Sequence, residues 1–170
     1  MKKLLFVLIG ISLTLIAIAQ NNTTYKSAIG IGADYGNDYT FVKGPSVKFF
    51  YNKTNAIESQ LLFGIKTAVL GAEYQHYIDI KEIPNLKCYT GIGPYWMYRK
   101  TIVYYYDNLF NLKYKEINLS DFIFRPIVGL DYKFKSLPVN LSIDWRPLFK
   151  ITNSTDYTIA RYGFSLRYAF

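Results

Sequence analysis

Apolar and polar residues alternate along eight stretches of this 170-residue chain, and Gly, Pro, Asn or Asp separates one stretch from the next. Successive side chains of a β-strand point to opposite faces, so alternation predicts a strand with one apolar and one polar face. After Gln20 no segment of useful length shows the 3.6-residue period of a helix. We therefore predict an all-β fold of eight strands, over residues 25–36, 44–52, 56–65, 67–78, 86–98, 121–134, 139–149 and 159–170.

The two faces are clearest in the late strands. In the stretch 121–134 the apolar face begins with Phe122, and the polar face carries Arg125 and Asp131. The stretch 139–149 repeats the pattern. Its predicted apolar face consists of Val139, Leu141, Ile143, Trp145, Pro147 and Phe149.

Eight alternating strands fit two kinds of barrel. A soluble ligand-binding barrel turns its apolar side chains inward, whereas a membrane barrel turns them outward to lipid and keeps polar residues inside. The polar faces here mix both charges with Gly and Ser, and they lack the long Lys and Glu rows of a soluble surface. Tyr and Trp lie toward the strand ends of the apolar faces, as in an interfacial girdle. We therefore predict a transmembrane antiparallel up-and-down β-barrel.

The amino-terminal segment predicts export through the general secretory pathway. Two lysines precede an apolar run, and an Ala-Ile-Ala sequence ends it at Ala19, which is the pattern of a cleaved signal peptide. The alternative, an uncleaved membrane anchor, needs about 20 apolar residues, and this run is shorter. We predict a signal peptide over 1–19 and a barrel domain over 20–170. Cys88 is the only cysteine, so no disulfide can form within one chain.

Connection lengths predict the orientation. Membrane barrels have short turns on the periplasmic side and longer loops outside the cell. The short connections 52–55, 79–85 and 135–138 then fall on the periplasmic side, and the long segment 99–120 falls outside. An even number of strands brings Phe170 back to the first strand, so the closed sheet has no open edge.

The segments GPSVKFFYNKTNAIE, GIGPYW and VGLDYKFKSLPVNLSIDWRP, with the terminal GFSLRYAF, give the chain its resemblance to a known family. It resembles the small eight-stranded outer-membrane β-barrel proteins of Gram-negative bacteria, over nearly all of the chain after the signal. The resemblance implies location in the outer membrane and a last strand that the barrel-assembly machinery reads, which is plausible as strand addition. It implies no single activity. The implied assembly-signal residues are Phe164, Leu166, Tyr168 and Phe170.

Charged residues on the polar faces form the first candidate site. One interpretation is a network of ion pairs that fills the lumen, in which Arg161 and Arg167 meet carboxylates such as Glu58 or Asp144. The other is a narrow pathway for ions or small solutes, with anion preference from a cationic excess. Eight strands leave barely enough width for side chains, which favours the network. The predicted lumen residues are Glu58, Glu73, Arg125, Asp131, Asp144, Arg146, Arg161 and Arg167.

The segment 99–120 is the second candidate site, because it combines aromatic and cationic residues outside the predicted membrane span. Such a surface could bind a protein, a glycan or a lipopolysaccharide phosphate. The alternative, compatible with the first, is two strands that continue beyond the membrane as a hairpin with ordinary Tyr content. The predicted surface residues are Arg99, Lys100, Tyr104, Tyr105, Tyr106, Phe110 and Tyr114.

Other chemistry has little support in the sequence. A lipid A-modifying enzyme needs an activated nucleophile near the leaflet surface, but His76 is the only histidine and no serine stands two positions after it. One histidine, one cysteine and no clustered carboxylates predict no metal and no cofactor. The net charge of +8 is scattered, which fits outer-membrane lipids, including lipopolysaccharide, better than nucleic acid. We therefore expect a structural or surface-interaction role without catalysis, with lipid A modification and a narrow pore as alternatives.

Overall fold

The structure is a computed structural model that describes residues 25–36, 40–106, 111–152 and 157–170. The predicted signal peptide lies outside the described residues. Within these ranges no helix is long and apolar enough to cross a membrane. The strands are β1 (Ser27–Gly36), β2 (Phe41–Phe50), β3 (Asn55–Gly64), β4 (Thr67–Asp79), β5 (Leu86–Tyr106), β6 (Leu112–Lys133), β7 (Val139–Trp145), β8 (Leu148–Lys150), β9 (Tyr157–Thr158) and β10 (Arg161–Ala169).

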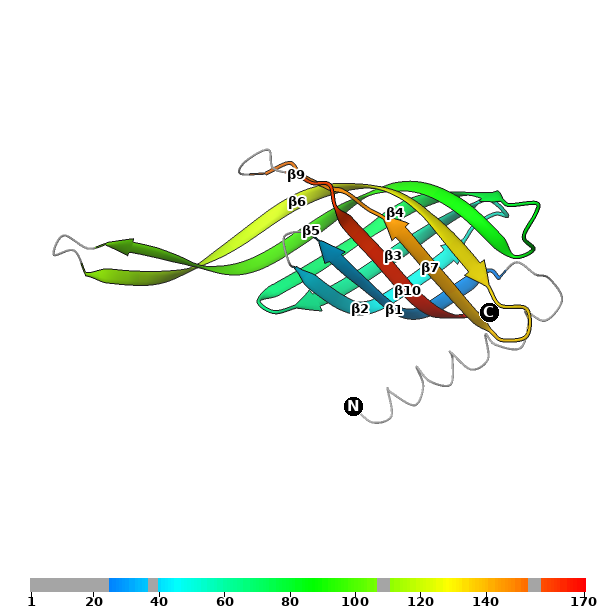
Figure 1. Cartoon of the computed structure of the whole chain (residues 1–170), viewed down its shortest axis with the longest axis horizontal. Coiled ribbons are helices and arrows are strands. Elements are labelled where there is room, and N and C mark those ends of the chain that lie inside the picture. Colours follow the sequence, from blue (N-terminus) through cyan, green and yellow to red (C-terminus); the bar gives the residue numbers. More distant parts are fainter. Residues whose placement is uncertain (1–24, 37–39, 107–110, 153–156) are drawn as a thin grey trace.

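The strands form a closed antiparallel ring in the order β1, β2, β3, β4, β5, β6, β7 and β10 (Figure 1). The ring closes where β10 pairs with β1, from Ala28 opposite Ala169 to Gly36 opposite Arg161. The short strand β8 extends the seventh wall and pairs with β6. The predicted eight-stranded up-and-down barrel is therefore confirmed, including the pairing of the last strand with the first.

Side chains alternate across the barrel wall as the sequence pattern predicts. On β10, Phe164 is 47% exposed on the outer face, whereas Arg167 is 1% exposed inside. The same contrast separates Phe122 from Arg125 on β6. The outer face is thus an apolar band that follows all the walls of the ring. A patch of this extent marks a surface that another phase or molecule covers.

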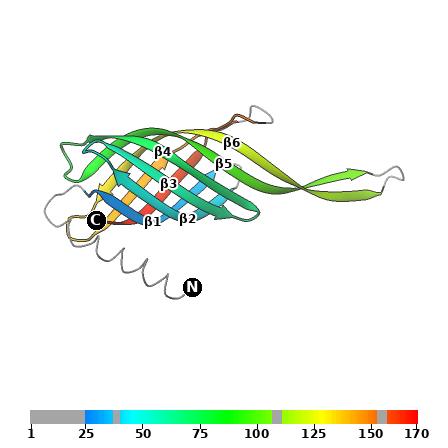
Figure 2. The ribbon, with the colours of Figure 1, turned by 180° about the vertical axis from the view of Figure 1, so that it is seen from behind.

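The two ends of the barrel differ, as Figures 1 and 2 show. The turns after β2, β4 and β6 lie at the end that carries the carboxyl terminus. At the other end β5 and β6 run on together, well beyond the rest of the barrel, as a twisted two-stranded ribbon. Their pairing continues as far as Tyr106 opposite Leu112.

This ribbon corrects the bounds of two predicted strands, since the strands predicted over 86–98 and 121–134 extend to Tyr106 and begin at Leu112. The segment 99–120 is not a long loop, because most of its described part is strand. The alternation that marked the other strands is missing here, since both faces of a two-stranded ribbon are exposed and neither must be apolar throughout. The hairpin alternative is the one that the structure shows.

A second correction concerns Pro147, which the alternation placed on the apolar outer face. Pro147 is buried, in the break between β7 and β8. Proline has no N–H for the strand ladder, which fits the interruption of the pairing at this position. The alternation resumes after the break, because Phe149 again faces outward and Leu148 inward.

The seam between β1 and β10 gives a test of the fold. A Cβ at Gly30 would overlap the carbonyl oxygen of Leu166 on β10, whereas a Cβ at Gly32 would meet only side-chain atoms, at 3.2 Å or more. We expect Gly30→Ala to destabilise the barrel by about 1–3 kcal/mol, because the strands must separate. Gly32→Ala, on the same strand and face, should change stability by less than about 1 kcal/mol. Urea unfolding in lipid vesicles, followed by the mobility of the unboiled protein, measures both. Equal midpoints for the two variants would contradict this packing of the seam.

Candidate functional site

The barrel interior collects the charged residues that alternation turns inward. All eight predicted lumen residues are at most 3% exposed: Glu58, Glu73, Arg125, Asp131, Asp144, Arg146, Arg161 and Arg167. They come from β3, β4, β6, β7, β10 and the break after β7. A buried charge is stable only when it is paired and hydrogen-bonded, so the contacts of these groups determine what the lumen can do.

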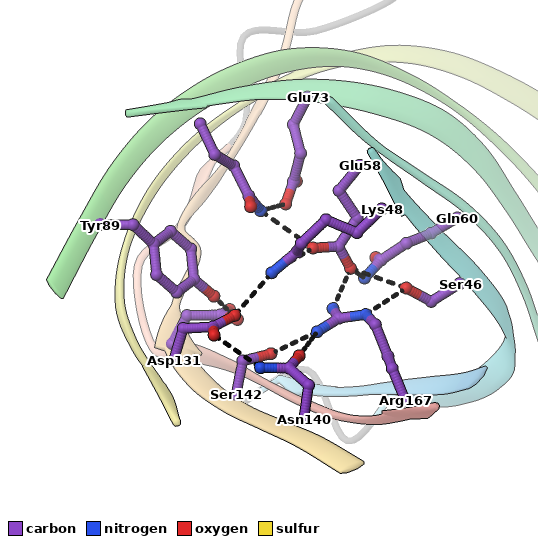
Figure 3. Close-up of polar contacts among 12 residues, drawn as sticks. Ser46, Lys48, Glu58, Gln60, Glu73, Tyr89, Asp131, Asn140, Ser142 and Arg167 are labelled. Carbon is purple, nitrogen blue, oxygen red and sulfur yellow. Dashed lines mark hydrogen bonds and ion pairs between the residues drawn. The ribbon is translucent and has the colours of Figure 1, made fainter. Parts of the chain in front are cut away.

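Arg167 is the centre of the half of the lumen near the carboxyl terminus (Figure 3). Its guanidinium donates to the Glu58 carboxylate across the interior. It also donates to Ser46 Oγ at 2.9 Å, Ser142 Oγ at 2.9 Å and Asn140 Oδ1 at 3.1 Å. The planar fork of arginine allows these bonds to form together.

Lys48 joins opposite walls of the same half. Its Nζ lies 2.8 Å from Asp131 and 3.3 Å from Glu58. β2 and β6 are four places apart in the ring of eight, so the Lys48–Asp131 ion pair spans the full width of the barrel (Figure 3). The ammonium also lies 5.3 Å and 5.2 Å from the ring centroids of Tyr77 and Tyr89, which adds cation–π attraction.

Asp34 is the centre of the other half. Its carboxylate lies 3.0 Å from Arg125, 3.0 Å from Arg146 and 3.7 Å from Arg161. Asp144 pairs with Arg146 from the other side. Arg161 thus approaches Asp34, a carboxylate that the sequence analysis did not name, while the expectation that Arg167 meets Glu58 agrees with the structure.

Glu73 is linked to the network by neutral groups. Tyr95 Oη donates to it at 2.7 Å and Gln75 Nε2 at 2.6 Å. The same amide lies 3.0 Å from Glu58, which is the cross-strand partner of Glu73. One glutamine amide thus stands between two neighbouring carboxylates and reduces their repulsion.

Two apolar layers bound the ionic layer, and the sequence analysis did not find them. The layer near the carboxyl terminus includes Tyr25, Phe50, Tyr77 and Tyr89. The layer near the ribbon consists of Val42, Leu62, Val69, Tyr95, Met97, Ile123 and Leu148.

The residues that sequence reasoning missed had a readable signal. Asp34 is in phase with Gly30 and Gly32, and Tyr77 is in phase with Glu73, so alternation alone turns both inward. Inward tyrosines escaped notice because tyrosine also suits a membrane boundary. The alternation along a strand does not predict which charges pair, because the partners lie on opposite sides of the lumen.

These contacts argue against the pore alternative. Among the described residues, five basic and six acidic side chains are buried, so the lumen has no cationic excess to select anions. Contacts such as Lys48–Asp131 and Arg146–Gln60, at 2.8 and 3.0 Å, join opposite walls. Direct contacts that cross the ionic layer narrow any water path through that level.

The side chains of His76 and Ser142 lie on opposite faces of the barrel wall. His76 faces outward, with Nδ1 2.7 Å from Asn55 Oδ1. Ser142 faces inward and accepts a hydrogen bond from Arg167. Within the described ranges no cluster of three His, Cys, Asp or Glu residues could hold a metal ion.

The ribbon carries the predicted surface residues. Tyr104 and Tyr114 are cross-strand partners on one face, 65% and 69% exposed. Tyr106, on the same face, is 70% exposed, and Tyr105 lies on the opposite face. Arg99 and Lys100 lie at the base of the ribbon, whereas Phe110 lies outside the described residues. Even-numbered residues of β5 face outward in the barrel, so the face with Tyr104 continues the apolar band.

The predicted assembly-signal residues lie along the seam. Phe164, Leu166 and Tyr168 face outward on β10, each more than 40% exposed. Phe170 follows the strand, and its N–H and C=O bond with Ser27 at 2.8 and 2.9 Å.

Comparison with known proteins gives matches in structure alone. No protein-family model and no curated protein sequence matches the chain. The amino-terminal β-barrel domain of OprF from Pseudomonas aeruginosa matches with a TM-score of 0.53 at 9% identity, over 85% of this chain and 99% of that one. A de novo designed transmembrane β-barrel matches with a TM-score of 0.53 at 9% identity, over 86% and 98%. Neisserial surface protein A matches with a TM-score of 0.51 at 15% identity, over 88% and 98%.

The chain has the fold of outer-membrane β-barrels. Identities of this size establish the fold alone, and the role of the protein depends on its own residues.

The ionic layer predicts a large penalty for the loss of one carboxylate. Glu58→Gln leaves the buried Arg167 without its counter-ion and leaves Lys48 with Asp131 alone, and we expect a loss of about 3–5 kcal/mol in unfolding free energy. Glu82→Gln, in the exposed turn after β4, removes the same charge and should cost less than about 0.5 kcal/mol. Urea unfolding in vesicles measures both, and similar midpoints would show that the network does not stabilise the barrel.

The contacts across the lumen predict that the protein does not conduct ions. The folded protein in planar bilayers should show no unitary conductance steps, because cross-barrel ion pairs and two apolar layers obstruct the path. A known porin in the same bilayers serves as the positive control. Regular anion-selective steps would establish the pore alternative instead.

Proposed function

We propose that the protein is an integral outer-membrane β-barrel, exported through the general secretory pathway, that acts without catalysis through its projecting ribbon. The observation that carries this proposal is the ribbon itself. A barrel closed by its own side chains extends two of its strands far beyond the ring and covers them with exposed aromatic side chains.

The outer surface supports the membrane location. Apolar side chains such as Ile31, Leu70 and Ile143 are 50% exposed or more around the ring. In water this band would cost free energy in proportion to its area, whereas lipid removes that penalty. The inverted arrangement, with charges inside and apolar groups outside, is that of a membrane barrel.

The arrangement of the ends supports the proposed orientation. Short turns and the carboxyl terminus share one end, which we assign to the periplasm, and the ribbon then points outside the cell. The outward aromatics Phe164, Leu166, Tyr168 and Phe170 would then reach the barrel-assembly machinery from the periplasmic side, by strand addition.

The ribbon supports an interaction role. Isolated two-stranded hairpins are only marginally stable in water, so a ribbon of this length benefits from a partner. Tyrosine combines a large apolar ring with a hydroxyl and is enriched at binding hot spots. Tyr104, Tyr106 and Tyr114 share one face, so a single flat partner can contact all three.

In-cell photo-crosslinking tests this role. A photoreactive residue at Tyr104, Tyr106 or Tyr114 should give one discrete crosslinked product, because the three side chains share a face. The same residue at Lys53, in the turn at the opposite end, should not give that product. The matched control keeps the photoreactive residue at Tyr104 and replaces Tyr106 and Tyr114 by Thr, which keeps the strands and removes the rest of the aromatic surface. It should give less of the product.

A shortened variant separates the ribbon from the barrel. Thr101 and Ile117 are cross-strand partners, so an Asn-Gly turn can join them and remove residues 102–116. We expect this variant to reach the outer membrane and to keep its heat-modifiable mobility. The proposal would be contradicted if Lys53 gave the same crosslinked product as the three tyrosines. It would also be contradicted if the full chain were recovered in a soluble fraction.

A further inference from the structure

A groove of about 640 Å³ lies where the barrel meets the base of the ribbon. The start of β2, the β3–β4 turn and β5 form its walls. Phe41 and Phe63, each 52% exposed, line it on the apolar side. Its other prominent lining residues are the four cations Lys43, Lys66, Arg99 and Lys100, and we call this site the rim groove.

Lys43 stands within the apolar band. It faces outward on β2, two residues after Phe41, and its cross-strand partner on β3 is Phe63. A lysine in such a place lays its methylene stem on apolar surface and extends its ammonium to the polar level. The rim groove therefore combines apolar walls with cationic side chains.

The aromatic residues of β5 indicate the level of the rim groove relative to the expected membrane boundary. Trp96 and Tyr98 are stacked on the outer face, with ring centroids 6.1 Å apart. Tyrosine and tryptophan mark the boundary between hydrocarbon and headgroups. Lys100 is the next residue on the same face of β5, so the cations lie at the level of the headgroups.

The β3–β4 turn holds Lys66 in an unusual backbone conformation. Its φ is 57°, in the left-handed region that Gly or Asn normally occupies. Its carbonyl accepts a hydrogen bond from the N–H of Lys100 at 2.8 Å, which brings the two lysines together. The turn thus brings the backbones of the two lysines together at the edge of the groove.

Neighbouring carboxylates only partly balance the rim groove. Glu116 lies 3.8 Å from Lys66 and is 61% exposed, and Asp121 lies 4.0 Å from Arg99. These two carboxylates are at the outer limit of ion-pair distances and are the ones that approach the four cations among the described residues. The groove thus keeps a positive charge beside its apolar walls.

We propose that the rim groove binds the phosphate of a phosphorylated glycolipid in the leaflet that surrounds the ribbon end. Lysine and arginine form strong charge-assisted hydrogen bonds with phosphate. Phe41 and Phe63 would contact the first acyl segments below the headgroup. The proposal deepens the proposed function, since it depends on the membrane orientation given above.

Lipid binding by the purified, folded full-length protein in a zwitterionic detergent tests the rim groove. The probes are diphosphorylated lipid A and the same lipid after removal of both phosphates, and native mass spectrometry counts bound lipid. We expect the diphosphorylated form to bind at least about tenfold more tightly. The variant Lys43→Gln, Lys66→Gln, Arg99→Gln and Lys100→Gln should lose this preference.

A second quadruple variant is the control for net charge. Lys26→Gln, Lys53→Gln, Lys81→Gln and Lys135→Gln remove four exposed cations at the opposite end of the barrel. This variant should keep the preference for phosphorylated lipid within about twofold. Heat-modifiable mobility shows that both variants are folded.

Three outcomes would overturn the inference. The first is equal lipid binding by both quadruple variants, and the second is equal binding of the phosphorylated and dephosphorylated lipid. The third is displacement of the lipid by inorganic phosphate at equal concentration, because this would indicate a site for free phosphate. This experiment measures lipid binding alone, with the ribbon intact. If the crosslinks at Tyr104 were not found, the proposed function would be contradicted, but the result of the lipid-binding experiment would still stand.

Discussion

The requirement that every backbone polar group find a partner governs this structure. A strand wall that faces hydrocarbon has no water to satisfy its N–H and C=O groups, so the sheet must close on itself. Closure comes from the pairing of β1 with β10, together with the two hydrogen bonds between Ser27 and Phe170. The alternation of side chains follows from the same requirement, because a closed single-layer sheet has one face toward the surroundings and one toward a narrow interior.

The interior of the barrel consists of layers and is not a single hydrophobic core. Aromatic and aliphatic side chains close the two ends, and the middle holds ion pairs that reach across the barrel. Buried ion pairs give little net stability compared with apolar packing, but the loss of one partner is expensive. The layer therefore specifies which strands stand opposite each other. Lys48 must find Asp131 and Arg167 must find Glu58, and a shift of one residue in any strand would turn those groups to the outer face.

Much of this could be predicted from the sequence, because alternation is a local signal. It gave the eight walls, the inward phase of the charges and the outward phase of residues such as Phe122. It failed where the outer environment changes: beyond Arg99 both faces of the ribbon are exposed, and the period of two disappears. It also failed at Pro147, where the pairing breaks. The pairing of Arg161 with Asp34 was out of reach, since it depends on the diameter and stagger of the closed ring.

The seam between β1 and β10 has a consequence for how the protein is made. The two strands that complete the ring are the first and the last of the described chain, so the decisive contacts are those most distant in sequence. Contacts between residues that are far apart in the sequence form slowly. No barrel can exist until β10 has been synthesised, and until then the apolar face of every earlier strand is exposed to water. A chain of this design must be kept from aggregating from its synthesis until the ring closes.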